Sequence, residues 1–535
     1  MKFPPDIYIS DLQQSVNRML SHLNIDLNST SAGSFDRSFW GWKRRDFQDS
    51  TLSGAYLPLQ KGLHRLENLI NIDFFRDVVL QNINLMQYNN GSFDQAYPYD
   101  GHPKVGFDFT EILYSYLIRN QDAVIRRVYK KLIHFGLKDE SYAIICNHLA
   151  HQVHELLQAA HYFNEQKYYD YAIDTLKRIA SNTDEEGWHT EYLGGDPGYQ
   201  SRTLKYLVRC MDMLHGQDRT MCENLCINSI KFLSKLIMPD GTLYPMFGSR
   251  NTALLYPSGI EYMAKNYPEI CGTVARRVRK SVLKKYAVTP LDLDFDNFLR
   301  LFDDFLDAQN IYEQQKDISS YCSNDSDSNN DEFDLVDFGF MKRSQGNISL
   351  FVHYKYGGAV AIYKNDELLY KNAGYLIEVK NGEYLGTRNL QILSILESRE
   401  NDSIELTSTL LKSIDKDLTP LQFVILRMLN LTLLRIGIIG DCFRKIIIKK
   451  IIIGNRKHDL GLFKRNIKLL KECVRITDNI ELNKAPNRIF KVVNLHLFHM
   501  ASSRYHYPVD RSLKLVRECT LREKENYIIT ESVEI

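Results

Sequence analysis

The stretch DISSYCSNDSDSNNDEFDLVD, residues 317–337, divides the chain into two parts with different hydrophobic periodicity. It holds seven acidic residues and many Ser and Asn, a composition typical of a solvated linker. Before it, apolar residues recur every three to four positions, and after it they alternate in short runs. We therefore expect an α-helical domain (residues 1–315), an acidic linker (316–333) and a β domain (334–535).

The helical pattern before the linker comes in pairs of segments. VIRRVYKKLIHFG (124–136) and YYDYAIDTLKRIASN (168–182), for example, carry apolar residues at helical spacing, and turns rich in Gly, Asp, Asn and Pro separate such segments. A pair spacing of roughly 40–50 residues indicates stacked helical hairpins. Periodicity alone leaves open whether the hairpins form a solenoid or close into an α/α toroid.

The β pattern after the linker is interrupted once. NISLFVHYKY (347–356) and GAVAIYKND (358–366) are typical of strands joined by Gly and Asn turns, whereas residues 419–436 predict a helix. The apolar stretch 421–439 has the length of a transmembrane helix, but Arg427, Asn430 and Arg435 interrupt it. Because a charge at the centre of a membrane is costly, we expect a buried or interfacial helix instead.

Composition excludes some classes of function. The chain has 535 residues and a net charge of +1, which gives no global field for nucleic acid. The N-terminal residues lack the apolar core of a secretory signal, and the nine Cys fit reduced thiols, so we expect a cytoplasmic protein. Residues 441–471 hold ten Lys and Arg against two Asp. They form either solvated strand faces or a surface for an anionic partner, an acidic polysaccharide or the inner membrane surface.

Polar and aromatic residues gather at the junctions between predicted helices. Four junctions supply them: the start of CNHLAHQVHELLQAAH (146–161), the loop GWHTEYLGGDPGYQSRTLKYL (187–207), FGSRNT (247–252) and YPYDGH (97–102). The GGDPG turn is expected to present Tyr199 at the start of a helix. In a toroid, alternate junctions collect at one rim, where they would line one cleft. The residues concerned are Asn147, His148, His189, Tyr192, Tyr199, Arg202, Arg250, Asn251, Tyr99 and His102.

This set of residue types suits removal of the C5 proton of a uronic acid. An Asn, His or Arg bound to the adjacent carboxylate stabilises the developing enolate, and a Tyr or His can take the proton. HLAHQVHE lacks the HExxH spacing of a zinc site, so we expect no metal and no cofactor. Hydrolysis, the alternative, needs two facing carboxylates. The acidic residues available for it are Asp94, Asp100, Asp108, Glu111, Asp196 and Glu261.

The chain resembles the heparinase II/III-like polysaccharide lyases, including the related alginate lyases. NHLAHQVHELLQAAHYF (147–163) is similar to that family's Asn-His helix, and GGDPGYQSRTLKYL (194–207) to its loop with the catalytic Tyr. The resemblance implies an incomplete α/α toroid of helical hairpins followed by an antiparallel β-sandwich. It also implies that Asn147 and His148 neutralise the substrate carboxylate and that Tyr199 is the base.

The β half departs from the family pattern. The family's Gly-Gly-x-His-x-His-x-Asp run corresponds to LFVHYKYGGAVAIYKND (350–366), where only His353 stands near an expected position. The expected Asp-x-Gly reads Asn-Ala-Gly, with Asn372 and Gly374. The resemblance assigns His353 and Tyr384 as the catalytic His and acid Tyr of the β domain.

Three functions follow from these observations. The first is a polysaccharide lyase that cleaves a uronate-containing glycan by β-elimination, in surface-polysaccharide metabolism. The second is a non-catalytic glycan-binding or polysaccharide-assembly protein, and the third is a glycoside hydrolase with an α/α toroid. In the first, substrate contacts come from Arg250, Arg202, His189, Tyr192, Tyr99, His102 and Asn251.

Overall fold

The computed structural model describes most of the helical part and the strands of the β part. The described residues are 3–24, 72–93, 107–137, 144–191, 194–293, 295–315, 331–379, 383–387, 392–398, 403–412, 419–433, 460–470, 473–483, 485–493, 513–516, 520–522 and 526–534, with 26, 28, 29, 32, 34, 439, 442 and 446. The candidate residues Tyr99, His102 and Tyr192 lie outside them.

Helices make up most of the described residues up to 313. They are α1 (Leu12–Ser21), α4 (Ile72–Met86), α5 (Phe107–Leu117), α6 (Ala123–Gly136), α7 (Cys146–Phe163), α8 (Gln166–Ser181), α9 (Pro197–Met211), α10 (Gly216–Leu236), α11 (Pro257–Asn266), α12 (Pro268–Leu283) and α13 (Phe295–Glu313). Helices α7 and α9 are central, because α7 packs on α8 and α9, and α9 also packs on α10 and α11. Their apolar stripes meet in one core, where burial of each large aliphatic side chain stabilises the fold by about 1.5–3 kcal/mol.

Strands make up most of the described residues of the second part, as the change of period predicts. They are β1 (Phe333–Leu335), β2 (Phe340–Gln345), β3 (Ile348–His353), β4 (Ala359–Lys364), β5 (Glu367–Asn372), β6 (Tyr375–Val379), β7 (Glu383–Gly386), β8 (Ile392–Ser398), β9 (Ser403–Thr409), β10 (Leu411–Lys412), β11 (Gly461–Leu469), β12 (Cys473–Leu482), β13 (Pro486–Val492), β14 (Leu513–Leu515), β15 (Thr520–Arg522) and β16 (Asn526–Glu534). All of their pairings are antiparallel.

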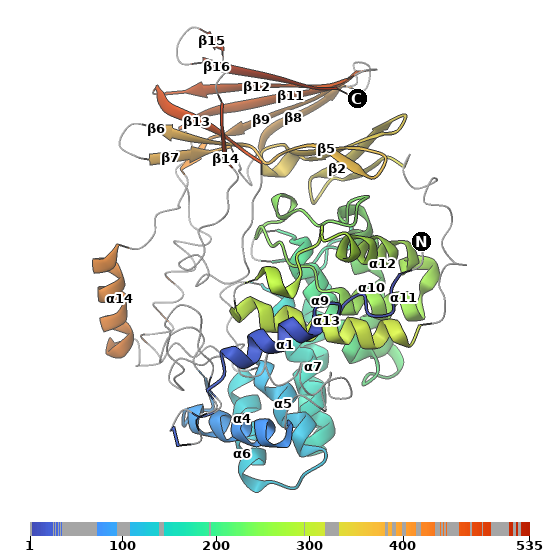
Figure 1. The fold of residues 1–535 in the computed structure, drawn as a ribbon, viewed down its shortest axis with the longest axis vertical. Coiled ribbons are helices and arrows are strands. Elements are labelled where there is room, and N and C mark those ends of the chain that lie inside the picture. The colour runs from blue at the N-terminus through green and yellow to red at the C-terminus, as the bar shows by residue number, and fades with distance from the viewer. Residues whose placement is uncertain are drawn as a thin grey trace.

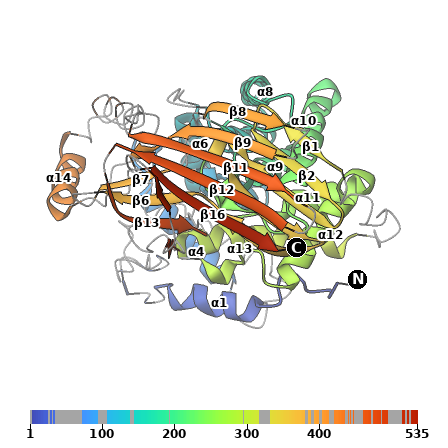
Figure 2. The ribbon, with the colours of Figure 1, turned by 90° about the horizontal axis from the view of Figure 1, so that it is seen from above.

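These strands form three sheets that pack in layers. Two five-stranded sheets have the orders β1-β2-β3-β4-β5 and β10-β7-β6-β13-β14, and the six-stranded sheet has the order β15-β16-β12-β11-β9-β8. One apolar core joins the first sheet to the six-stranded sheet, through Val352 and Ile467 for example. Another joins the second sheet to it, through Ile377 and Ile480. Figures 1 and 2 show the six-stranded sheet as the outermost layer, with the helices on the other side of the five-stranded sheets.

A mixed apolar core holds the helical and β parts together. It contains Phe232 of α10 and Phe247, together with Phe338 and Phe340 from the start of the β part. The Glu186 carboxylate accepts the backbone N–H groups of residues 337 and 338, at 2.9 and 2.8 Å. The first five-stranded sheet is therefore fixed directly over the loops that follow α8 and α10.

Helix α14 (Pro420–Leu431) lies within the residues 419–436 for which the sequence predicts a helix, and most of its described side chains are exposed. Leu421 is 69% exposed and Met428 63% exposed. Figure 1 shows α14 at the left edge of the view, apart from the other helices and below the level of the sheets. In the part of the chain that the structure describes, no helix combines the length and the apolar character that a membrane span requires.

Candidate functional site

Asn147, at the start of α7, is bonded to a carboxylate that the sequence did not single out. Its backbone N–H donates to Oε1 of Glu191 and its side-chain Nδ2 donates to Oε2, both at 2.8 Å. The two side chains are each 1% exposed. The first turn of a helix has N–H groups without helical partners, and here Glu191 accepts one of them from a loop 44 positions away.

Burial makes Glu191 a weaker acid than an ordinary glutamate. It raises the pKa of this carboxyl to about 8, against the hydrogen bonds from Asn147, which favour the charged form. At neutral pH Glu191 is therefore largely protonated. Asn147 Oδ1 has no hydrogen-bond partner in the described structure, and half a turn of the amide would let it accept the Glu191 proton. The pair can thus adapt to both protonation states.

Replacing Glu191 with glutamine is expected to remove a pH dependence of stability. A carboxyl whose pKa is raised on folding binds more protons in the folded state between its unfolded value and about pH 8. Its contribution is complete below the unfolded pKa and is lost as the pH rises through about 8. From pH 6 to 7.5, Glu191→Gln should gain about 2 kcal/mol over the wild type, measured by urea unfolding. Parallel unfolding curves for both proteins across that range would contradict the assignment.

Asp196 ties the loop after α10 to the start of α9. It is fully buried and caps α9, where Oδ1 accepts the Tyr199 N–H at 3.1 Å. Oδ2 accepts the N–H groups of Arg250 at 2.9 Å and Thr252 at 3.4 Å. A Cβ at Gly248 would lie 2.3 Å from Oδ2, so only glycine lets the loop approach this carboxylate. The backbone of Arg250 is therefore held beside the helix start that carries Tyr199.

A chain of contacts extends this cluster to the β part. The Ser249 N–H donates to the carbonyl of Gly195 at 3.0 Å, which joins the two loops. The Tyr356 hydroxyl lies 2.9 Å from the place a Cβ would occupy on Gly194. The rings of Tyr356 and His353 have centroids 4.1 Å apart. We call Asp196, Tyr199, Arg250, Tyr356 and His353, together with the Asn147–Glu191 pair and with His148, which follows Asn147 on α7, the junction cluster.

The members differ in how far they reach the surface. Asn147 and His353 are buried, and Tyr199 is 7% exposed, whereas His148 and Arg250 are half-buried. His353 packs against Phe338 and Phe340, with ring centroids 4.7 and 5.9 Å away. Among the members of the junction cluster, His148 and Arg250 are therefore the ones that expose the most surface. Asn251, beside Arg250, is half-buried and has a left-handed backbone, with φ of 53°.

Two predicted site residues take other places. His189 is fully buried, and its ring nitrogens contact the hydroxyls of Thr183 and Ser229, both at 2.8 Å. Burial lowers its pKa to about 3, so His189 is a neutral residue of the core rather than a substrate ligand. Tyr384 lies on β7, 37% exposed and opposite Glu378 of β6, and no described contact joins it to the junction cluster.

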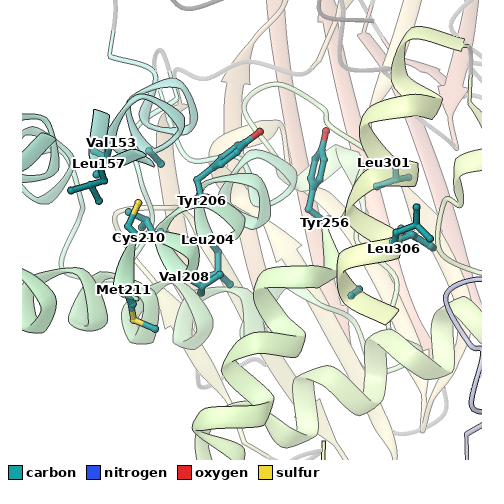
Figure 3. Close-up of a cluster of buried hydrophobic side chains, with 14 of the residues drawn as sticks. Val153, Leu157, Leu204, Tyr206, Val208, Cys210, Met211, Tyr256, Leu301 and Leu306 are labelled. Carbon is teal, nitrogen blue, oxygen red and sulfur yellow. The ribbon is translucent and has the colours of Figure 1, made fainter. Parts of the chain in front are cut away.

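Arg202 faces a second group of polar side chains inside the helical part. Its guanidinium lies 6.0 Å from the ring centres of both Tyr206 and Tyr256. Figure 3 shows these two rings with their hydroxyls on the same side, pointing away from Leu204. Lys205 forms ion pairs with Asp303 at 3.0 Å and Asp304 at 3.4 Å. Arg202 therefore lies beside this interior network.

The carboxylates proposed for hydrolysis are engaged in internal bonds where the structure describes them. Glu111 pairs with Arg209 at 3.2 Å. Glu261 receives Arg279 at 2.5 Å and the Tyr8 hydroxyl at 2.6 Å. Asp196 accepts three backbone N–H groups, as described above. Asp94, Asp100 and the side chain of Asp108 lie outside the described residues.

Sequence comparison finds no protein-family model and no curated protein that matches the chain. Three solved structures have partly similar traces. A chondroitinase AC lyase is 9% identical, over 92% of this chain and 67% of its own, with a TM-score of 0.46. The heparan sulfate lyase HepC from Pedobacter heparinus is 9% identical, over 90% and 70%, with a TM-score of 0.35. An unsaturated glucuronyl hydrolase from Streptococcus agalactiae is 11% identical, over 59% and 99%, with a TM-score of 0.38.

Proposed function

We propose that this protein cleaves a uronate-containing glycan by β-elimination, with the helical part as an α/α toroid, the packed sheets as a β-sandwich and the junction cluster as the active site. The reaction removes the C5 proton of the uronate, forms the C4=C5 double bond, breaks the C4–O bond and returns a proton to the leaving oxygen. It needs a group that neutralises the substrate carboxylate and a group that exchanges protons. Both kinds of group are present in the junction cluster.

The observation that carries this proposal is the Asn147–Glu191 pair. At neutral pH it is a largely uncharged set of hydrogen-bonding groups, because the Glu191 pKa is raised to about 8. An uncharged acid does not repel a substrate carboxylate as an ionised Glu would, and a helix N-terminus adds a favourable partial charge. Direct contact with that carboxylate is assigned to two side chains. These are His148, which follows Asn147 on α7, and Arg250.

Tyr199 is the proposed proton-transfer group. It stands at the third position of α9, where the Asp196 cap fixes its backbone. A tyrosine has an ordinary pKa of about 10 and acts as a base near neutral pH only where cations stabilise its phenolate. The Arg250 backbone is bonded to the same Asp196 carboxylate, which places one cation on the adjoining loop. His353 of the β part packs against the Tyr356 ring, and we propose that it holds this ring in place at the site.

A second candidate function is glycan binding without turnover. The observation that favours it is burial: His353 is fully buried among aromatic rings and Tyr199 is 7% exposed. In that case the same cluster would recognise an acidic sugar and leave its bonds intact. Hydrolysis is less well supported, because Glu111, Asp196 and Glu261 are engaged in internal bonds.

One experiment separates these functions. The folded protein is incubated with a panel of uronate polymers, and the ultraviolet absorbance of the unsaturated product is followed together with the appearance of new reducing ends. Both signals together support β-elimination. New reducing ends without absorbance support hydrolysis and contradict the proposal. Retention of a polymer on an affinity gel, with neither signal, supports the binding protein.

We also propose peripheral contact with an anionic membrane, at the inner surface, through α14 and the basic stretch. Leu421 and Met428 are more than half exposed, and Val424 is 52% exposed. Residues 444–457, RKIIIKKIIIGNRK, add six Lys and Arg. Exposed apolar residues on a helix that precedes a basic stretch in the sequence suit the surface of an anionic bilayer. Arg465, which lies further along in residues 441–471, does not contribute to this membrane contact, because it is fully buried.

Placing aspartate at both Leu421 and Met428 is expected to weaken binding to phosphatidylserine-containing vesicles at least about tenfold, because two apolar side chains no longer enter the bilayer. Co-sedimentation measures the effect. Leu283→Asp, which alters a 42% exposed leucine on α12, is the matched control and should bind as the wild type does. Equal sedimentation of all three proteins would contradict contact through α14.

A further inference from the structure

A cavity of about 800 Å³ lies between the helical and β parts, outside the junction cluster. Most of its lining comes from three segments: the turn 240–246 after α10, residues between 280 and 288 at the end of α12, and the β4–β5 turn with β5, up to Lys371. The Lys280–Asp366 ion pair, at 2.5 Å, joins α12 to the β4–β5 turn at this cavity. Pockets of this volume bind small ligands such as one or two sugar units.

Lys371 is the cavity's distinctive group. It is half-buried, and its ammonium lies 5.1 Å from the centre of the Tyr244 ring. In the described structure no carboxylate lies within ion-pair distance of it. Burial lowers the pKa of Lys371 more than the attraction of the Asp240 carboxylate raises it, so the ammonium has lost water that this carboxylate does not fully replace. A bound anion would supply a closer counter-ion.

The acidic residues that line the cavity either form bonds with neighbouring side chains or lie exposed at its edge. Asp240 accepts the Thr242 hydroxyl at 2.7 Å and the Tyr363 hydroxyl at 3.1 Å. Asp366 is paired with Lys280. Glu367 is exposed in the β4–β5 turn. Of the other lysines that line the cavity, Lys280 is paired with Asp366 and Lys284 is exposed. Lys371 is therefore the half-buried cation that a ligand of this cavity would meet.

The walls also suit a sugar. The Tyr244 hydroxyl is bonded to the Tyr363 hydroxyl at 2.8 Å, which fixes the Tyr244 ring. Apolar side chains of Met246, Leu255 and Leu368 complete the lining. Aromatic and apolar walls with a few polar groups bind a ring that has an apolar face and one charged substituent.

We propose that this cavity is a second carbohydrate site, which binds a hexuronate unit with its carboxylate on Lys371 and its ring against Tyr244. The choice of a uronate rests on the proposed function, whereas the need for an anion rests on Lys371 alone. Because both parts of the chain line the cavity, the bound sugar bridges them. A polymer held there as well as at the junction cluster would contact two sites of one molecule.

The test is calorimetric titration with D-glucuronate, D-glucose and acetate. The wild type is expected to bind glucuronate, and Lys371→Met to bind it at least about tenfold more weakly, as loss of a charge-assisted hydrogen bond predicts. Lys177→Met, a change of a 63% exposed lysine on α8, is the matched control and should bind as the wild type does. The affinity should fall as the pH rises toward the lowered pKa of Lys371.

Three outcomes would overturn the proposal: no glucuronate binding, equal affinity in Lys371→Met, or acetate binding as tightly as glucuronate, which would show an anion site without sugar recognition. Unchanged thermal melting of Lys371→Met excludes misfolding as the cause of weak binding. The proposed function is tested separately by product formation, because Lys371 lies outside the junction cluster. Lys371-dependent glucuronate binding without any lyase product would remove the proposed function and leave this site standing.

Discussion

Replacing Tyr199 with phenylalanine is expected to lower kcat for β-elimination by about 10²–10⁴-fold, the usual contribution of a positioned proton-transfer group. Phenylalanine keeps the ring in its place at the start of α9, and the Asp196 cap bonds only the backbone N–H of residue 199. The change therefore removes the hydroxyl and little else. The initial rate of unsaturated product formation, at saturating and at low polymer concentration, measures it.

A selective loss of kcat is what distinguishes catalysis from binding here. If the Tyr199 hydroxyl transfers a proton, KM should change much less than kcat. Tyr171→Phe, which alters a half-exposed tyrosine on α8, is the control and should leave both parameters unchanged. A Tyr199→Phe protein with the wild-type kcat would exclude Tyr199 as the base, and a rise of KM alone would assign it to sugar binding.

Local sequence signals were sufficient for the start of α9. Gly and Pro in GGDPG mark a turn, and Asp followed by Pro is a usual way to begin a helix. The structure confirms this prediction, with Asp196 as the cap and Pro197 as the first helical residue. The order of a helical part followed by antiparallel sheets was equally accessible, because the hydrophobic period changes at residues 317–337.

Glu191 could not be found in the same way. Its role depends on the approach of a loop to a helix start 44 positions earlier, and its raised pKa depends on burial by both. Neither leaves a pattern in the neighbouring residues. His189 shows the converse: a histidine in a polar loop predicted a ligand, yet two hydroxyls and complete burial make it a neutral core residue.

The basic stretch 441–471 shows the same limit for charged residues. The sequence alone predicts that Arg465 is one of ten cations on a solvated or anion-binding surface. In the structure it is fully buried on β11 and bonds both oxygens of Asp478 on β12, at 2.7 Å each. It also donates to the carbonyl of Gly358 at 2.5 Å, and Asp478 accepts the Tyr375 hydroxyl at 2.7 Å. The pair therefore links the six-stranded sheet to both five-stranded sheets.

Replacing Arg465 with methionine is expected to destabilise the protein by about 3–5 kcal/mol, because it leaves Asp478 buried without its partner. Urea unfolding followed by circular dichroism measures the change. The neighbouring Lys464 is the matched control, since its pair with Glu481 is partly exposed and Lys464→Met should cost less than about 1 kcal/mol. Adding Asp478→Leu to Arg465→Met should recover part of the loss, because no uncompensated charge then remains buried. Equal unfolding midpoints for the Arg465 and Lys464 variants would show that the buried pair does not hold the three sheets together.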